Sequence, residues 1–190
     1  MAVLITGAAG FIGSNLVRHL LERWPSRELV SCDLLTYAGH LANLEEVATP
    51  RRHHFVRGAV ADRDAVRSVL EEHDVDGIIH LAAESHVDRS IVEPRAFVHS
   101  NVVGTVILLQ EAARLWKDRT DVRFHHVSTD EVFGSLDEDG AFHENHPYSP
   151  NSPYSASKAA ADHFVRAWHE TYGLPVVITN CTNNYGPYQF

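Results

Sequence analysis

The chain has 190 residues, of which 44% are hydrophobic and 22% are charged, and these values suit one globular domain with a substantial core. The formal net charge of −9 disfavours general nucleic-acid binding, which needs a positive surface. No apolar run is long enough to span a membrane, and the first residues lack the positive start and cleavage site of a signal peptide. Cys32 and Cys181 show no disulfide framework, so we expect a reduced, cytoplasmic protein.

Short apolar runs alternate with amphipathic stretches along the whole chain. The runs are rich in valine and isoleucine, as buried parallel strands are, and they predict strands at residues 3–6, 29–32, 54–56, 77–81, 124–128 and 176–179. The stretches between them predict helices at residues 11–23, 63–73, 94–116 and 154–172. This alternation predicts an α/β fold with a doubly wound parallel sheet and helices on both faces, formed by residues 1–190 as one domain.

Residue types at the expected helix ends agree with these boundaries. Ser152 can cap the last helix, and Pro153 suits its first turn because the missing amide would be unpaired there anyway. Gly173 suits the left-handed position that ends a helix, and Pro94 begins the third helix as Pro153 begins the last. Residues 134–150, rich in acidic residues, glycine and proline, are predicted as a long irregular loop.

Fourteen histidines are present, and two pairs of them raise the question of a metal site. His53-His54 and His125-His126 lie at predicted strands without the HxxxH or HxH spacing of metal ligands. We interpret them as residues flanking strands and predict no metal.

A glycine motif follows the first strand and opens the first helix. Gly7, Gly10 and Gly13 have the spacing GxxGxxG, which lets the backbone turn tightly and approach a pyrophosphate without an intervening side chain. The free amides and the dipole of the helix then face the anion. This variant of the motif resembles that of the short-chain dehydrogenase/reductase superfamily.

Asp33 ends the second strand, 20 residues after Gly13. A carboxylate at this place can accept hydrogen bonds from the adenosine ribose and repels a 2′-phosphate, so it favours NAD over NADP. The alternative is that Asp33 only caps a turn or a helix.

Tyr154 and Lys158 lie four residues apart at the start of the last helix. Residues at this spacing share one helical face. An ammonium group near a phenol favours the phenolate, so we expect a lowered pKa for Tyr154. Such a tyrosine can take a proton from an alcohol while a hydride leaves the same carbon.

Thr129, Asp130 and Glu131 follow the fifth strand. Ligands of doubly wound sheets lie beyond the carboxyl ends of the strands, so these side chains are expected near Tyr154. Thr129 can bond the reacting hydroxyl, and two adjacent carboxyl groups can serve as one acid and one base. A helix-capping aspartate and a solvated glutamate remain the alternative for Asp130 and Glu131.

Longer segments resemble one family of sugar-nucleotide enzymes. They are GAAGFIGSNLVRHLL, DLLTYAGHLANL, LAAESHVDRSI, HHVSTDEVFG, SPYSASKAAADHFVRAW and TNCTNNYGPYQF. These are similar to the dTDP-glucose 4,6-dehydratases, NAD-dependent members of the extended short-chain dehydrogenases/reductases with a Rossmann fold. The TDE triplet is the most discriminating part, since related epimerases resemble SSATVYG there and GDP-mannose dehydratases resemble TSE.

The resemblance implies dehydration of dTDP-glucose, or a related nucleotide sugar, to a 4-keto-6-deoxy product through tightly bound NAD. Tyr154, helped by Lys158 and Thr129, would act in oxidation at C4. Glu131 would then remove the C5 proton while Asp130 protonates the departing 6-hydroxyl, and hydride would return to C6.

The resemblance also implies binding residues. The substrate would meet Ser85, Thr129 and Asn183. The cofactor would meet Gly7, Gly10, Phe11, Ile12, Gly13, Asp33, Leu34, Thr36, Ala59, Val60, Leu81, Ala82, Ala83, Ser85, Ser100, Tyr154, Lys158 and Asn184.

Three residues depart from the family pattern. The family usually has aspartate at Ala59, lysine at Leu34 and tyrosine at Phe133. The first two changes are expected to weaken NAD binding, whereas the third is expected to be mild.

Family members are homodimers built through two long helices, which correspond here to residues 94–116 and 154–172. They also continue into a smaller carboxyl-terminal substrate domain, which is expected to be missing from these 190 residues. Two alternatives stay open. One is another sugar-nucleotide enzyme such as a C4 epimerase, which needs Tyr154 but no acid pair. The other is an NAD-binding protein without turnover.

Overall fold

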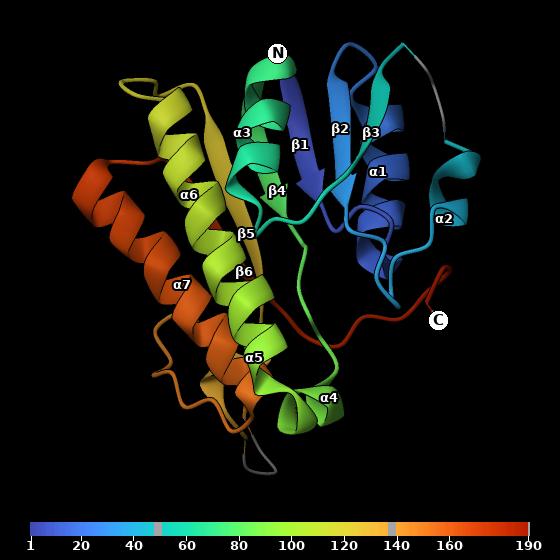
Figure 1. Ribbon diagram of the computed structural model, residues 1–190. Helices are drawn as coiled ribbons and strands as arrows, with labels where there is room; N and C mark the ends of the chain where they lie inside the picture. The colour runs from blue at the N-terminus through green and yellow to red at the C-terminus, as the bar shows by residue number, and fades with distance from the viewer. Residues whose placement is uncertain (48–50, 137–139, 190) are drawn as a thin grey trace.

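Six parallel strands form one sheet in a computed structural model that describes residues 1–47, 51–136 and 140–189. Their order across the sheet is β3-β2-β1-β4-β5-β6 (Figure 1), which is the order of a doubly wound Rossmann sheet. The strands are β1 (Ala2–Thr6), β2 (Glu28–Asp33), β3 (His53–Arg57), β4 (Val75–His80), β5 (Arg123–Thr129) and β6 (Val176–Cys181). All six predicted strands and the predicted fold are therefore confirmed, with strand ends shifted by one or two residues.

The four predicted helices are also present, and the third one is not uniform. They are α1 (Phe11–Arg23), α3 (Arg63–Glu72), the continuous segment of α5 (Pro94–Phe97), η1 (Val98–Val103) and α6 (Gly104–Leu115), and α7 (Pro153–Tyr172). Segment η1 is a π-helix, a form that often marks functional sites. Three short elements were not predicted, because elements of this length show no periodicity. They are α2 (Ala42–Glu45), α4 (Val87–Val92) and the 3-10 turn η2 (Asp130–Phe133).

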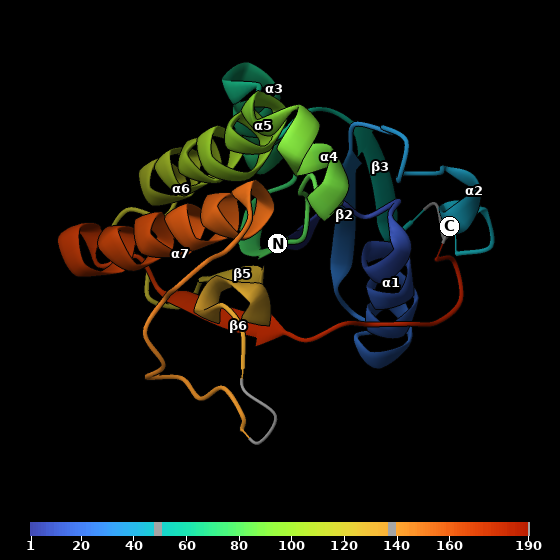
Figure 2. The same cartoon turned by 90° about the horizontal axis from the view of Figure 1, so that it is seen from below.

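The helices cover both faces of the sheet, as predicted. One apolar cluster joins Leu4, Ile78 and Phe124 of the sheet to side chains of α3, α6 and α7. The other joins Val3 and Ile5 to side chains of α1 and α2. Figure 2 shows α6 and α7 side by side on one side of the sheet and α1 on the other.

Helix α7 carries the predicted end signals. Ser152 caps it by accepting from the Ser155 amide at 3.0 Å, and the Ser155 hydroxyl accepts from the Ser152 amide at 3.0 Å. Pro153 occupies the first turn, and Gly173 ends the helix in the left-handed conformation with φ +69°. These local signals set the position of Tyr154 in the first turn.

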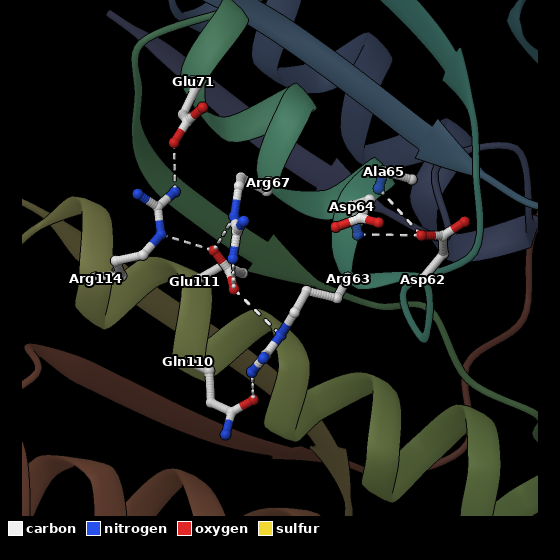
Figure 3. A network of polar contacts seen from close by, with 9 residues as sticks. All are labelled: Asp62, Arg63, Asp64, Ala65, Arg67, Glu71, Gln110, Glu111 and Arg114. Carbon is white, nitrogen blue, oxygen red and sulfur yellow. Dashed lines mark hydrogen bonds and ion pairs between the residues drawn. The ribbon is translucent and has the colours of Figure 1, made fainter.

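A cluster of charged side chains forms ion pairs between α3 and α6 (Figure 3). The Glu111 carboxylate on α6 is only 2% exposed. It pairs with Arg63 at 3.3 Å and Arg67 at 3.1 Å on α3, and with Arg114 at 2.8 Å on its own helix. The guanidinium groups of Arg67 and Arg114 hold the pKa of Glu111 below its usual value, chiefly through the hydrogen bond from Arg67.

The loop predicted at 134–150 contains no helix or strand among its described residues, and residues 137–139 of it lie outside them. Both cysteines are free thiols. Within the described ranges, no helix is long and apolar enough to cross a membrane, and no group of acidic, histidine or cysteine side chains is arranged to hold a metal ion.

Candidate active site

A cavity of about 540 Å³ opens where the strand order reverses, beyond the carboxyl ends of β1, β2 and β4. This is the place where ligands bind in doubly wound sheets, and the volume is typical of small-molecule sites. The predicted cofactor residues that line it are Gly7, Gly10, Phe11, Ile12, Gly13, Asp33, Leu34, Thr36, Ala59, Val60, Leu81, Ala82, Ala83, Ser85, Ser100, Tyr154 and Lys158. Only Asn184 of that set lies elsewhere.

The glycine loop has the close approaches that its motif predicts. Gly7 has φ +69°, and a Cβ atom there would lie 2.7 Å from the backbone nitrogen of Ala82. A Cβ atom on Gly13 would lie 2.1 Å from the carbonyl oxygen of Gly7. Helix α1 starts after Gly10 without a side-chain cap. Its first amides therefore stay available for an anion, and this cradle fits a pyrophosphate.

Asp33 ends β2 at the cavity, and both of its oxygens already have backbone donors. Its Oδ2 accepts from the Ala9 amide at 2.9 Å, and its Oδ1 accepts from the Leu35 amide at 2.8 Å. The carboxylate thus holds the glycine loop and the loop after β2 in place. Each oxygen has a second lone pair for a ribose hydroxyl, so the turn-capping function and the predicted cofactor contact are compatible.

Two of the residues that depart from the family pattern line this cavity. Ala59 lines it without a carboxylate, and Leu34 lines it with 48% of its side chain exposed. Phe133 is buried instead against Phe142 and Tyr148, with its ring 5.2 Å from that of Tyr148.

Lys158 is enclosed beneath the cavity and is only 4% exposed. Its Nζ donates to the carbonyl oxygen of Val127 in β5 at 2.8 Å. Burial lowers the pKa of Lys158 to about 8, against the opposing attraction of Asp162. The ammonium group is therefore anchored to the end of β5.

The expected lowering of the Tyr154 pKa is wrong for the protein without ligand. Burial raises the pKa of Tyr154 to about 12, and the negative charge of Glu131 acts in the same direction, whereas hydrogen bonding with Thr129 opposes it. Burial is the main cause, and the charges of Glu131, Asp162 and Asp130 add to it. Lys158 does not offset them, because its ammonium group bonds the Val127 carbonyl. A four-residue spacing puts two side chains on one helical face, but it does not say where their ends point.

Thr129, Asp130 and Glu131 gather next to Tyr154 rather than inside the cavity. Thr129 is buried at the end of β5, and its hydroxyl accepts from the Glu131 amide at 3.2 Å, which caps η2. Burial, followed by the charge of Asp130, raises the pKa of Glu131. The predicted convergence of the phenol and the acid pair is supported, since both carboxylates act on the pKa of Tyr154.

The segment after β6 does not bring the two predicted asparagines into the cavity. Asn183 and Asn184 are exposed, and the Asn184 side chain donates to the Thr182 carbonyl at 2.9 Å. The chain instead runs to α1 (Figure 2), where the Asn15 side chain donates to the Pro187 carbonyl at 2.9 Å. Tyr188, one residue further on, lines the cavity.

A buried polar chain behind the cavity was not predicted. His80 Nδ1 lies 2.7 Å from Thr6 Oγ1, and its Nε2 lies 3.0 Å from Thr105 Oγ1. Asn101 in η1 donates to Ser157 on α7 at 2.9 Å and bonds the backbone of Glu84 on the far side. The available signal was the polar run His99, Ser100 and Asn101 between apolar residues of the predicted helix 94–116.

The predicted interpretation of the histidine pairs as strand residues is confirmed. His53 and His54 lie in β3, and His125 and His126 lie in β5. His126 is buried, and its Nε2 lies 3.1 Å from the carboxylate of Asp162 on α7. Burial holds the pKa of His126 well below its usual value.

Comparison with known proteins assigns the chain to a family. A sequence profile described as GDP-mannose 4,6 dehydratase matches residues 4–190. The chain belongs to this family. The curated relatives that it matches include dTDP-glucose 4,6-dehydratases, as the sequence motifs predict.

The relatives within the family are close in sequence and fold. dTDP-glucose 4,6-dehydratase of Xanthomonas campestris pv. campestris (strain B100) is 54% identical, with 98% of this chain and 54% of the relative aligned. The Escherichia coli enzyme of that name is 50% identical, covering 100% of this chain and 56% of the relative. Thus the chain spans about half the length of the curated relatives it matches.

Solved structures give the same result. DesIV, a dTDP-glucose 4,6-dehydratase from Streptomyces venezuelae solved with NAD bound, is 50% identical with a TM-score of 0.91, covering 100% of this chain and 58% of that one. The UDP-glucose 4-epimerase of Thermotoga maritima is 27% identical with a TM-score of 0.88, covering 100% of this chain and 58% of that one.

Proposed function

We propose that this chain is the NAD-binding and catalytic portion of a dTDP-glucose 4,6-dehydratase. The observation that carries the proposal is the cavity itself: a glycine-rich anion cradle lies at one part of it, and Tyr154 and Lys158 line another. The relatives of about 50% identity that bear this name support the choice of substrate.

Bound NAD supplies a reversible hydride acceptor and a positively charged ring. The chain's own groups handle protons. The Tyr154 phenolic oxygen takes the proton from the substrate hydroxyl at C4, and a positive charge beside it would counter the burial that raises its pKa to about 12. Lys158, fixed by Val127, would hold the ribose of the bound dinucleotide by a hydrogen bond.

The acid pair then serves the loss of water. Glu131, whose raised pKa makes its carboxylate a stronger base, removes the proton at C5. Asp130 donates a proton to the departing hydroxyl at C6. An epimerase needs no such pair, so Asp130 and Glu131 favour dehydration over epimerisation.

The deciding experiment mixes the protein with NAD and dTDP-glucose and follows formation of a 4-keto-6-deoxy sugar nucleotide. It is run on the 190-residue chain and on a chimera that joins the chain to the remaining half of a dTDP-glucose 4,6-dehydratase relative. Formation of the product by the chimera supports the proposal. A product that retains its 6-hydroxyl would assign the chain to the epimerases. NAD binding without any turnover in the chimera would indicate a non-catalytic protein.

Variants of that chimera separate the two steps. Glu131→Gln is expected to spare oxidation at C4 and to slow elimination, whereas Tyr154→Phe slows the first step. An equal loss of both steps in Glu131→Gln would contradict the division of labour.

We also propose that the protein is a homodimer and that NAD is preferred over NADP. Val98 and Val103 on η1 and Phe164 on α7 are exposed apolar side chains on the two long helices, which supports an interface there. The cytoplasmic location stays a prediction from the sequence.

A further inference from the structure

Two loops that are far apart in the chain meet beside the cavity. The Tyr37 hydroxyl lies 2.9 Å from Nδ1 of His86, and the two rings pack edge to face with centroids 5.1 Å apart. Tyr37 belongs to the loop after β2, whereas His86 begins α4 after β4. Strands β2 and β4 lie on either side of β1, so this contact passes across the strand that leads into the glycine loop.

The loop after β2 is held firmly on the cavity side. Asp33 accepts from the Leu35 amide, and Leu35 adopts φ +58°. The Gly39 amide donates to the Thr36 carbonyl at 3.2 Å, and the His40 amide donates to the Ala9 carbonyl at 3.1 Å. Because both ends of the loop are tied down, Tyr37 is presented at its tip.

The loop after β4 is held by the π-helical segment. The Glu84 amide donates to Asn101 Oδ1 at 2.8 Å, and the Asn101 amide group donates to the Glu84 carbonyl at 2.9 Å. These two bonds fix the backbone just before His86.

Arg89 on α4 completes the contact. Its guanidinium carbon lies 3.8 Å from the centre of the Tyr37 ring, and its Nη1 lies 3.6 Å from the Glu84 carboxylate. A cation over a tyrosine face is attracted by the ring, so Arg89 links the tip of one loop to the base of the other. Tyr37 itself is 42% exposed and lies outside the cavity lining.

The cavity is lined by residues that lie next to Tyr37 and next to His86. Thr36 and Ala38 flank Tyr37 on one side, and Ser85 precedes His86 on the other, where His86 is itself a lining residue. We propose that Tyr37, His86 and Arg89 form a clasp over the cavity that slows release of a bound nicotinamide dinucleotide. The three are positioning residues, since they act by holding two cofactor-lining loops together.

The clasp rests on the proposed function and deepens it. A reaction that withdraws a hydride and then returns it regenerates the cofactor in every turnover. Release of the dinucleotide is therefore not needed for product formation, and slow release prevents loss of the reduced form in mid-reaction. Separating the two loops means breaking the hydrogen bonding of the Tyr37 hydroxyl, which involves His86, Glu84 and Ser85, and the contact of Arg89 with the Tyr37 ring. Tyr37, His86 and Arg89 are all exposed side chains.

The test measures dissociation of radiolabelled NAD from the pre-loaded protein after dilution into excess unlabelled NAD. Tyr37→Phe keeps the ring and the Arg89 contact but removes the hydroxyl. We expect its dissociation rate to rise about fivefold, as for the loss of one hydrogen bond. His86→Phe should do the same. The double variant should be no faster than Tyr37→Phe alone, because Tyr37→Phe already removes the hydroxyl that His86 contacts.

Arg89→Gln provides a second, independent variant and is also expected to release NAD faster. Tyr172→Phe is the matched control, since Tyr172 is exposed at the far end of α7, roughly 27 Å along that helix from Tyr154. NAD release from Tyr172→Phe should equal that of the wild type.

The outcomes separate the clasp from the function on which it rests. Wild-type protein that binds no NAD in an equilibrium titration would overturn the proposed function and the clasp together. Wild-type binding with unchanged release in Tyr37→Phe, His86→Phe and Arg89→Gln would overturn the clasp alone.

Discussion

The ammonium group of Lys158 is a buried charge next to the cavity. It is almost completely buried, with the Val127 carbonyl as its hydrogen-bond acceptor and Asp162 as the attracting charge. Enclosure disfavours the charged form of a lysine, which is why its pKa falls to about 8. A buried charge of this kind costs stability and is typical of functional sites.

This cost predicts a pH dependence of stability. Because the folded pKa of about 8 lies below the ordinary 10.5, the unfolded chain binds more protons between these values, and stability rises with pH across that window. Lys158→Met removes the effect. The free energy of unfolding of the wild type, relative to this variant, should increase by at most about 3 kcal/mol between pH 7 and 10.

Urea unfolding at both pH values measures this difference. Lys117→Met is the control, since Lys117 is exposed, and its difference from the wild type should not change with pH. A constant difference for Lys158→Met would mean that Lys158 is not buried as a charge.

At the scale of elements, the contact between α3 and α6 depends on one buried carboxylate. Glu111 is almost fully buried, whereas its arginine partners are 42–48% exposed. If the carboxylate is removed, these arginine side chains remain solvated. The resulting loss of unfolding free energy should therefore be smaller than for a fully buried ion pair.

Glu111→Gln is therefore expected to lower the free energy of unfolding by about 1–2 kcal/mol. The pKa of Glu111 is lower in the folded protein than in the unfolded chain. The stability that this difference provides is present above the ordinary glutamate pKa and is lost as the pH falls through the pKa of the folded protein. The destabilisation by Glu111→Gln should therefore be smaller under acid conditions. Urea denaturation at pH 7 and pH 3.5 measures the destabilisation and its decrease under acid conditions. Glu71→Gln, which removes one exposed ion pair with Arg114, should change stability by less than about 0.5 kcal/mol. Equal effects of both variants would contradict the special position of Glu111.

The start of α7 depends on Ser152 in a similar way. Ser152→Ala removes the acceptor for the Ser155 amide and should destabilise the protein by about 1 kcal/mol. Ser152→Asp keeps an acceptor and should restore most of the loss. The midpoint of thermal unfolding measures both, and a failure of aspartate to rescue would argue against a capping function.

At the scale of the whole molecule, the proposed dimer can be tested through two exposed apolar side chains. The long helices expose Val103 and Phe164 to solvent, with 40% and 39% of their surfaces accessible. Val103 ends η1, which contacts α7, and α6 and α7 lie side by side in both views (Figures 1 and 2). The proposed interface would use the two long helices together.

Val103→Asp and Phe164→Asp should each convert a dimer into a monomer, because a carboxylate would be buried without a partner in the interface. Sedimentation velocity measures the oligomeric state. Leu41→Asp introduces the same charge at an exposed leucine in the α2 region and should leave the dimer intact. A wild-type protein that sediments as a monomer at micromolar concentration would refute the dimer.

The sequence by itself determined whatever depends on neighbours along the chain. Valine-rich runs became strands, Ser152 and Gly173 bounded α7, and the spacing of Gly7, Gly10 and Gly13 predicted the cradle, since backbone conformation and helical periodicity are local properties. Only the tertiary structure decided which distant groups meet. The partner of Lys158 and the contact of Tyr37 with His86 join residues 31 and 49 positions apart, and the pKa of Tyr154 depends on carboxylates from η2 and α7. Strand order and crossovers bring such groups together, and no local pattern in the chain encodes that arrangement.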